Sequence, residues 1–306
     1  MAIQWFPGHM HKAKKAIAER MKTTDVVIEV LDARLPGSSA NPLLENLSER
    51  RPKLKILNKQ DLADPARTEA WLAHYRNQSK TQAIALDASE KATQKLIQAC
   101  RDLVPNRGGI DKPLRVLICG IPNVGKSTLI NSMMGKRSAK TGNEPGITKQ
   151  EQRIFLADDF WLFDTPGMLW PKIIVEEGGY NLAASGAVGR NAIDEEEVSL
   201  ELLDYLRQYY PEQIVARFKL GVGPDEYANW HDNDWFDAIA RKRGALLGGG
   251  RVDHQKVAEI ILTDYRAGLM GRVTLETPEE WTHWLAVAKE KEIVLREVRA
   301  AKKAAR

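Results

Sequence analysis

Short apolar runs alternate with amphipathic stretches along the first half of this 306-residue chain. Continuous runs of β-branched and apolar residues are typical of strands that are buried on both faces of a parallel sheet. Helical segments at residues 66–78 and 91–103 separate such runs, and this alternation predicts a doubly wound, mainly parallel α/β sheet. The expected strands lie at residues 25–31, 54–57, 83–86 and 114–119.

Residues 9–22 are expected to form a helix, because apolar residues recur in them at helical spacing. The apolar stripe consists of Met10, Ala13, Ile17 and Met21. The opposite face is basic, and both solvation and a nucleic-acid contact fit its composition. It carries Lys12, Lys14, Lys15, Arg20 and Lys22.

The pattern changes near residue 175, after two further strands at residues 152–156 and 160–163. From there on the sequence has helical periodicity without strand signals, and Asp194 is expected to cap the first long helix. The expected helices lie at residues 195–209, 211–219, 234–246, 253–267 and 278–305. The sequence therefore predicts an α/β domain over residues 1–175 and an all-helical domain over residues 176–306.

Composition adds little to this picture. Apolar residues make up 43% and charged residues 28% of the chain, as in ordinary globular proteins. A membrane-spanning run and a secretion signal are both absent from the sequence, so we expect no membrane contact and a cytoplasmic location. Cys119 falls in an expected core strand, which argues against a disulfide with Cys100 and for a reducing compartment. The net charge of +4 is weak evidence for a nucleic-acid partner.

The first candidate functional motif directly follows the expected strand at residues 114–119. Residues 120–127 read GIPNVGKS, which matches the phosphate-binding loop (P-loop) pattern GxxxxGK[ST], and a helix is expected after them. The N–H groups of such a loop and of the helix N-terminus face phosphates, and Lys126 adds a positive charge. The expected phosphate contacts are Asn123, Val124, Gly125, Lys126, Ser127, Thr128 and Gly167.

Three oxygen-bearing side chains are expected around a Mg²⁺ ion. Ser127 supplies one hydroxyl, and Thr148, in a glycine- and proline-broken loop, is the candidate for a second. Asp164 begins a D-T-P-G motif at a strand end and can hold Mg²⁺ through water.

A guanine-reading motif, N-K-x-D, follows the strand at residues 54–57. The carboxylate of Asp61 can accept two hydrogen bonds from guanine that adenine cannot offer, which predicts GTP rather than ATP. Asn58 is expected to reach the opposite edge of the base, and the stem of Lys59 to pack on its face. The expected backing of the base is the segment Asp87, Ala88 and Ser89.

The guanine motif precedes the P-loop, which reverses the order of most GTPases. A permuted chain can build the same site because contacts depend on spatial order. The order N-K-x-D, G-x-P-N-V-G-K-S, P-G-I-T and D-T-P-G, behind an N-terminal W-F-P-G-H-M segment, resembles the circularly permuted ribosome-biogenesis GTPases of the YlqF/RbgA type. The resemblance implies GTP hydrolysis stimulated by the large ribosomal subunit, late in its assembly. We expect the chain to be a monomer off the ribosome. The D-A-S segment at residues 87–89 departs from that family, whose loop reads closer to S-A or N-S.

Two further residues are expected to support hydrolysis. Met168 follows D-x-x-G where a water-orienting Gln is usual, and methionine has no group that orients water. The resemblance assigns the catalytic role to His9, whose imidazole can accept a proton or donate to the γ-phosphate. A helix-capping or RNA-facing histidine is the alternative. Asn123 is a candidate K⁺ ligand beside the phosphates, or else a loop-stabilising residue.

The leading hypothesis is a GTPase switch that docks on ribosomal RNA. A nucleic-acid-binding module with a vestigial nucleotide site is a rival, and so is a translation-type or tRNA-modifying GTPase. A nucleotide-dependent rearrangement of the switch at residues 164–167 would pull on the helical domain that follows it in the chain. The alternative is that the segment connecting the two domains is a rigid tether. The expected RNA contacts outside the N-terminal helix are Arg241, Lys242, Arg243, Arg251, Arg296, Arg299, Lys302, Lys303 and Arg306.

Overall fold

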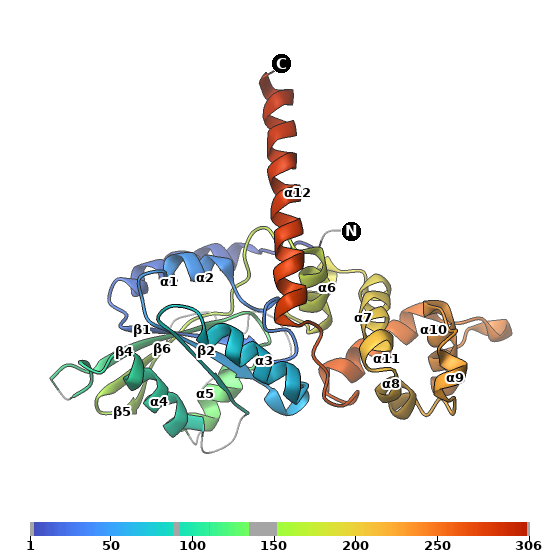
Figure 1. Ribbon diagram of the computed structural model, residues 1–306, viewed down its shortest axis with the longest axis horizontal. Coiled ribbons are helices and arrows are strands. Elements are labelled where there is room, and N and C mark those ends of the chain that lie inside the picture. Colours follow the sequence, from blue (N-terminus) through green and yellow to red (C-terminus); the bar gives the residue numbers. More distant parts are fainter. Residues whose placement is uncertain (1–2, 88–91, 110, 135–151, 305–306) are drawn as a thin grey trace.

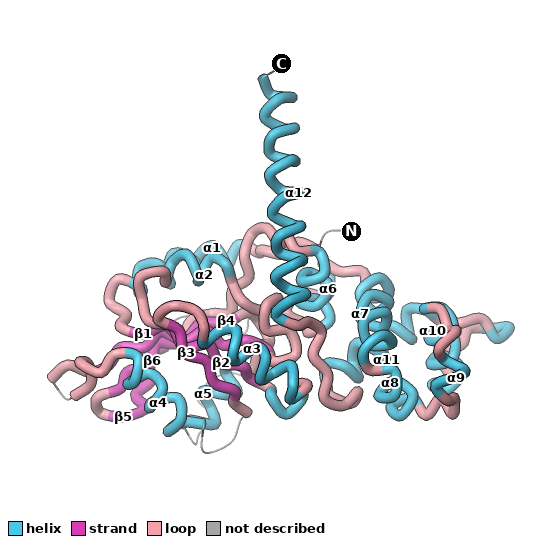
Figure 2. The backbone as a smooth tube through the Cα atoms, in the orientation of Figure 1, coloured by secondary structure: helices cyan, strands magenta, loops and turns pink. Residues whose placement is uncertain are grey.

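The chain forms an α/β part and a helical part, and a long C-terminal helix projects from between them (Figures 1 and 2). This computed structural model describes residues 3–87, 92–109, 111–134 and 152–304. The strands are β1 (Val26–Asp32), β2 (Lys53–Asn58), β3 (Thr81–Ala85), β4 (Leu114–Gly120), β5 (Gln152–Ala157) and β6 (Phe160–Asp164).

The six strands form one sheet in the order β3-β2-β1-β4-β6-β5. Strand β5 pairs antiparallel with β6, and the other neighbours pair in parallel. Every residue of β1 and β2 is buried, including Glu29 of β1 and Lys55 of β2, which form an ion pair with each other. In the centre, Ile28 of β1 lies opposite Ile118 of β4. The half of the chain that carries N-K-x-D and the half that carries the P-loop therefore share one sheet.

Helices cover both faces of this sheet, which confirms the doubly wound prediction (Figure 1). Helices α1 and α2 lie on one face, and α3, α4 and α5 lie on the other. All four residues of the predicted apolar stripe of α1 are buried. Helix α2 was not predicted; Asn41 caps it by accepting a hydrogen bond from the backbone N–H of Leu43. The bounds are α1 (Gly8–Met21), α2 (Pro42–Leu47), α3 (Pro65–Arg76), α4 (Ala92–Leu103) and α5 (Lys126–Met134).

The helical part packs around an apolar core that includes Leu202, Leu203, Trp235 and Ile261. Asp194 caps α7 as predicted, since its carboxylate accepts hydrogen bonds from the N–H groups of the first turn at 2.9 and 3.2 Å. Helices α6 and α9 were not predicted. The helices are α6 (Glu176–Ala184), α7 (Glu195–Tyr209), α8 (Pro211–Phe218), α9 (Pro224–Tyr227), α10 (Asp232–Arg243) and α11 (His254–Arg266).

The final helix, α12 (Pro278–Ala304), begins on the α/β part and then leaves the body of the molecule (Figure 2). Its first turn packs against the α/β part through Trp281, because a Cβ on Gly37 would lie only 2.5 Å from the Trp281 ring. Gly178 of α6 approaches the same ring. The C-terminal segment thus bridges the two parts, and the division at residues 175 and 176 remains our proposed domain boundary.

Two simpler expectations concern the cysteines and the membrane. Cys100 and Cys119 are both buried as free thiols. Among the helices that the structure describes, none is long and apolar enough to cross a membrane.

Candidate nucleotide-binding site

The P-loop connects β4 to α5, as the strand–loop–helix pattern predicts. Gly125 has a φ of +87°, and a Cβ there would lie 2.5 Å from Nδ2 of Asn58. A glycine is required at this position because both the backbone angle and the space exclude a side chain. Lys126 is the first residue of α5, so the N-terminus of this helix lies at the loop, where anions bind.

An ion pair within the site joins Lys126 to Asp164 at the end of β6, and both side chains are buried. Within the described residues the second carboxylate oxygen of Asp164, Oδ2, is buried without a hydrogen-bond partner. Burial raises the pKa of Asp164, against the opposing charge of Lys126. A buried carboxylate oxygen without a hydrogen-bond partner lowers the stability of the folded state unless a ligand binds to it. Asp164 and the hydroxyl of the neighbouring Ser127 are therefore the residues at this point of the site that could hold a metal ion.

The guanine motif lies directly against the P-loop, although Asn58 and Val124 are 66 residues apart in the chain. Asn58 Nδ2 donates to the carbonyl oxygen of Val124 at 2.9 Å, and Lys59 Nζ donates to that of Asn123 at 2.8 Å. Asp61 lies in the short 3₁₀ turn η1 (Gln60–Leu62) and is exposed, so its carboxylate is accessible to a base. The structure therefore brings N-K-x-D and the P-loop into one site.

Two buried residues beneath this site were not assigned a role from the sequence. The Arg34 guanidinium binds both carboxylate oxygens of Asp32, at 3.0 and 2.9 Å, and Lys59 Nζ binds Asp32 at 2.7 Å. Burial alone would raise the pKa of Asp32, but the two neighbouring cations outweigh it and hold the pKa well below its usual range. Arg34 also donates to the carbonyl oxygen of Tyr265 on α11. The signal in the sequence was a D-A-R segment directly after a buried strand.

The D-T-P-G segment at residues 164–167 lies against the P-loop. A Cβ on Gly167 would lie 3.1 Å from the backbone of Pro122, and the N–H of Met168 donates to the carbonyl oxygen of Gly120 at 3.1 Å. The Met168 side chain is buried, and Asn41 Nδ2 binds its carbonyl oxygen. The residue after D-x-x-G is therefore a core residue.

His9 lies in the first turn of α1 and is exposed. Its ring faces the edge of Trp5, with 6.4 Å between the ring centroids, and Trp5 packs on Gly189 beyond α6. The preceding Gln4 exchanges two hydrogen bonds with the backbone of Ile173, downstream of D-T-P-G. The N-terminal segment thus lies along the chain that leaves the switch region.

The remaining predicted guanine and metal residues are only partly described. The loops after β2 and β3 adjoin, because the N–H of Gln60 donates to the carbonyl oxygen of Leu86 at 3.4 Å. Asp87 follows and is half-buried. Ala88, Ser89 and Thr148 lie outside the described residues.

The predicted basic residues of the helical part are in different environments. Arg241 is exposed, with a loose contact of 3.9 Å to Asp237. Arg243 instead pairs with Asp264 at 3.3 Å and lies over the Phe218 ring. Lys242, Arg251, Arg296, Arg299 and Lys302 are exposed. The side chain of Lys303, and Arg306 altogether, lie outside the described part of the chain.

Comparison with known proteins adds an independent line of argument. A family model described as 50S ribosome-binding GTPase matches residues 115–218. Ribosome biogenesis GTPase A of Priestia megaterium is 40% identical over 289 residues, which cover 92% of this chain and 98% of the relative. The protein of that name from Thermotoga maritima is 31% identical and covers 92% of this chain and 96% of its own length.

Solved structures agree with these relatives. The GNP-bound structure of YlqF from T. maritima superposes with a TM-score of 0.64 at 26% identity, and it covers 88% of this chain and 99% of the other. A GDP-bound structure of the same protein matches with the same TM-score. From the permuted motif order, the joined nucleotide site and these full-length matches, we conclude that the chain belongs to the ribosome biogenesis GTPase A family and is a GTP-binding GTP hydrolase.

Proposed function

We propose that this chain binds the large ribosomal subunit, promotes a late step of its assembly, and hydrolyses GTP to license its own release. The GTP-binding part of this proposal rests on the contact of Lys59 with the carbonyl oxygen of Asn123 in the P-loop, because this contact joins the base-reading and phosphate-binding motifs. The names of the relatives and the 50S description of the matching family model support the partner.

The proposed GTP site uses the residues predicted from the sequence. Asp61 accepts hydrogen bonds from the guanine edge, with Asn58, Lys59 and the loop at residues 87–89 around the base. The P-loop residues, Thr128 and the Gly167 N–H hold the phosphates. Ser127, Thr148 and, through water, Asp164 would hold a Mg²⁺ ion, which would neutralise phosphate charge. Asn123 is the proposed ligand for a K⁺ ion beside the β- and γ-phosphates.

The proposed catalytic residue is His9. The buried Met168 cannot orient a water molecule, so another group has to do so. His9 is exposed at the start of a helix whose N-terminal extension follows the chain after the switch. Docking on the subunit would bring its imidazole to the attacking water, which it orients or deprotonates.

The test is GTP turnover by the purified chain alone, with large subunits, and with small subunits. We expect large subunits to stimulate turnover and small subunits to leave it unchanged. Stimulation by tRNA or by complete ribosomes alone would instead favour a translation-type or tRNA-modifying GTPase. The proposed free form is a monomer in the cytoplasm, and light scattering in the absence of subunits checks its mass.

A further inference from the structure

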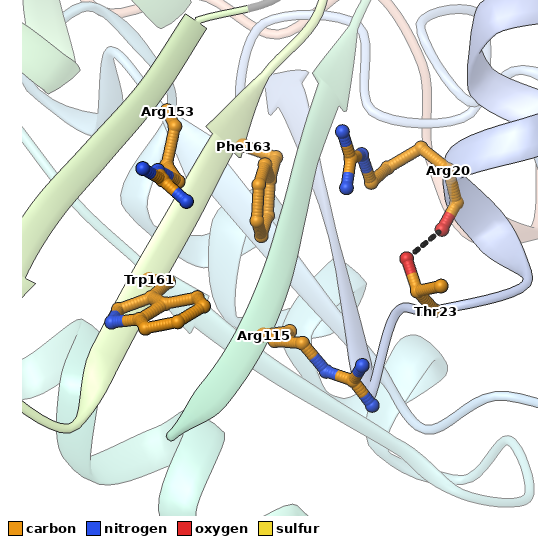
Figure 3. Close-up of a pocket in the computed structure, with 6 residues that line it drawn as sticks. All are labelled: Arg20, Thr23, Arg115, Arg153, Trp161 and Phe163. Atoms are coloured by element: carbon orange, nitrogen blue, oxygen red, sulfur yellow. Dashed lines mark hydrogen bonds between the residues drawn. The ribbon is translucent and has the colours of Figure 1, made fainter. Parts of the chain in front are cut away.

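An open groove of about 430 Å³ lies on the sheet, on the same side as α1 (Figure 3). Figure 3 shows side chains from the end of α1 and from β4, β6 and β5 around it. We call it the arginine–aromatic groove. It is lined by Arg20, Thr23, Arg115, Arg153, Trp161 and Phe163.

The register of the strands explains why these side chains gather. Arg115 of β4 lies opposite Trp161 of β6, and Arg153 of β5 lies opposite Phe163. Alternate residues of a strand share a face, so the side chains of all four lie on the same side of the sheet. Phe155 lies on the same face beside the groove, since it is opposite Trp161 in the strand register, and the residue is 57% exposed.

The groove combines guanidinium groups with aromatic rings. Arg153 lies over the rings of Phe155 and Trp161, at 4.9 and 5.4 Å from their centroids, and Arg20 lies 4.3 Å from that of Phe163. Within the described residues Arg153 makes no ion pair, and its side chain is exposed. Arg115 is neutralised by Asp25. The groove is therefore a positively charged surface with aromatic side chains, next to the edge strand β5 of the sheet.

Rings and guanidinium planes on an open sheet are the elements on which unpaired nucleic-acid bases stack, while arginine charges bind the phosphates between them. A base-paired duplex would not use the rings, because its bases are already stacked on one another. We propose that the arginine–aromatic groove binds a single-stranded RNA segment, with bases on Phe155 and Trp161 and phosphates on Arg153. This inference rests on the proposed function, which makes ribosomal RNA the source of that segment.

The experiment uses the full chain and variants of exposed residues, so that folding is preserved. Phe155→Ala removes a stacking ring, and Phe155→Tyr keeps one. Arg153→Glu reverses one charge in the groove, and Lys80→Glu makes the same change at the start of β3, on the opposite edge of the sheet. Unchanged GTP binding and melting temperature verify that each variant is folded. The probe is a labelled oligouridylate of about 12 nucleotides, followed by fluorescence anisotropy.

We expect Phe155→Ala to weaken oligouridylate binding by about tenfold and Phe155→Tyr to leave it nearly unchanged. Arg153→Glu should weaken binding and lower its dependence on salt, whereas Lys80→Glu should do neither. Equal affinity of all variants, or no binding of the oligonucleotide by the wild type, overturns the proposal.

Co-sedimentation with large subunits separates this inference from the proposed function. If the wild type does not sediment with large subunits, the proposed function itself fails. If it sediments and the groove variants sediment equally well, only the groove assignment fails. If the groove variants lose subunit binding although the wild type binds no oligonucleotide, the groove contacts a protein, and the RNA proposal is wrong.

Discussion

The side-chain amide of Asn123 donates a hydrogen bond to the carbonyl oxygen of Gly186, over 2.6 Å. Asn123 lies in the P-loop, and Gly186 lies just beyond Ser185, the C-cap of α6 in the helical part. Arg266 of α11 binds the adjacent carbonyl of Ala184. The sequence placed the connection between the two parts at residues 164–167, where the chain passes from one to the other. The structure adds a non-covalent contact from the phosphate-binding loop itself.

The first prediction concerns this asparagine. If Asn123 helps to hold K⁺, subunit-stimulated GTP turnover should be faster in K⁺ than in Na⁺, and Asn123→Ala should abolish the difference. The measurement is the initial rate of phosphate release at matched ionic strength. Equal wild-type rates in the two salts would assign Asn123 to loop stabilisation alone.

The second prediction concerns guanine recognition. Asp61→Asn should weaken GTP binding by roughly 100-fold or more, because an amide places a donor where guanine also donates. Xanthine offers a carbonyl at that position and should bind the variant better than guanine does. Competition of GTP and XTP with a fluorescent nucleotide measures both affinities. An unchanged GTP affinity would remove Asp61 from the site.

The third prediction concerns catalysis. His9→Ala should retain GTP and subunit binding, while single-turnover hydrolysis on the large subunit falls by roughly 100-fold or more. His11→Ala is the matched control on the same helix, since its ring packs on Phe6, 4.6 Å between centroids. Hydrolysis by His9→Ala at the wild-type rate would exclude His9 as the catalytic residue.

The fourth prediction concerns a buried carboxylate between the two parts. Glu276 Oε1 accepts from the Ser38 N–H at 2.8 Å, and Oε2 accepts from Asn181 Nδ2 of α6 at 3.1 Å. Burial raises its pKa to about 7, against the opposing hydrogen bonds from Ser38 and Asn181. The folded state therefore favours the protonated acid relative to the unfolded chain.

That contribution to stability is fully present below the unfolded-state pKa, 4.5, and is lost as the pH rises through about 7. Between about pH 5 and about pH 8 the wild type should therefore lose unfolding free energy relative to Glu276→Gln, which cannot ionise. Urea unfolding of both proteins across this range measures the difference. Parallel pH profiles would show that Glu276 has an ordinary pKa.

The fifth prediction separates two neighbouring arginines. Arg241→Ala should weaken binding to large subunits and lower its salt dependence without loss of stability, because the side chain is exposed. Arg243→Ala should mainly destabilise the helical part, because it removes a partner of the nearly buried Asp264. Thermal melting and sedimentation at several salt concentrations distinguish the two effects. If Arg241→Ala binds like the wild type, Arg241 is not an RNA contact.

The sequence by itself determined most elements of the fold. The strand at residues 114–119, the helix at residues 9–22 and the cap at Asp194 are local features, and each appears in the structure close to its predicted bounds. Hydrophobic periodicity and capping act over a few residues, so they can be read without the fold. Helices α2 and α6 were missed, because a six-residue helix and one that carries Gly178 and Gly179 have weak local signals.

The motifs also predicted GTP as the nucleotide, because a P-loop and an N-K-x-D motif are each short runs of neighbouring residues. The order of the motifs along the chain predicted the circular permutation. Only the tertiary structure decided what these motifs contact. The bonds from Asn58 and Lys59 to the P-loop, and the pairing of Arg243 with Asp264, join residues that belong to different elements of the fold. The physical reason is that burial and charge pairing depend on which surfaces meet in space. A local pattern can place an arginine on a helix, but the neighbouring helix decides whether its charge is paired or is available to a partner.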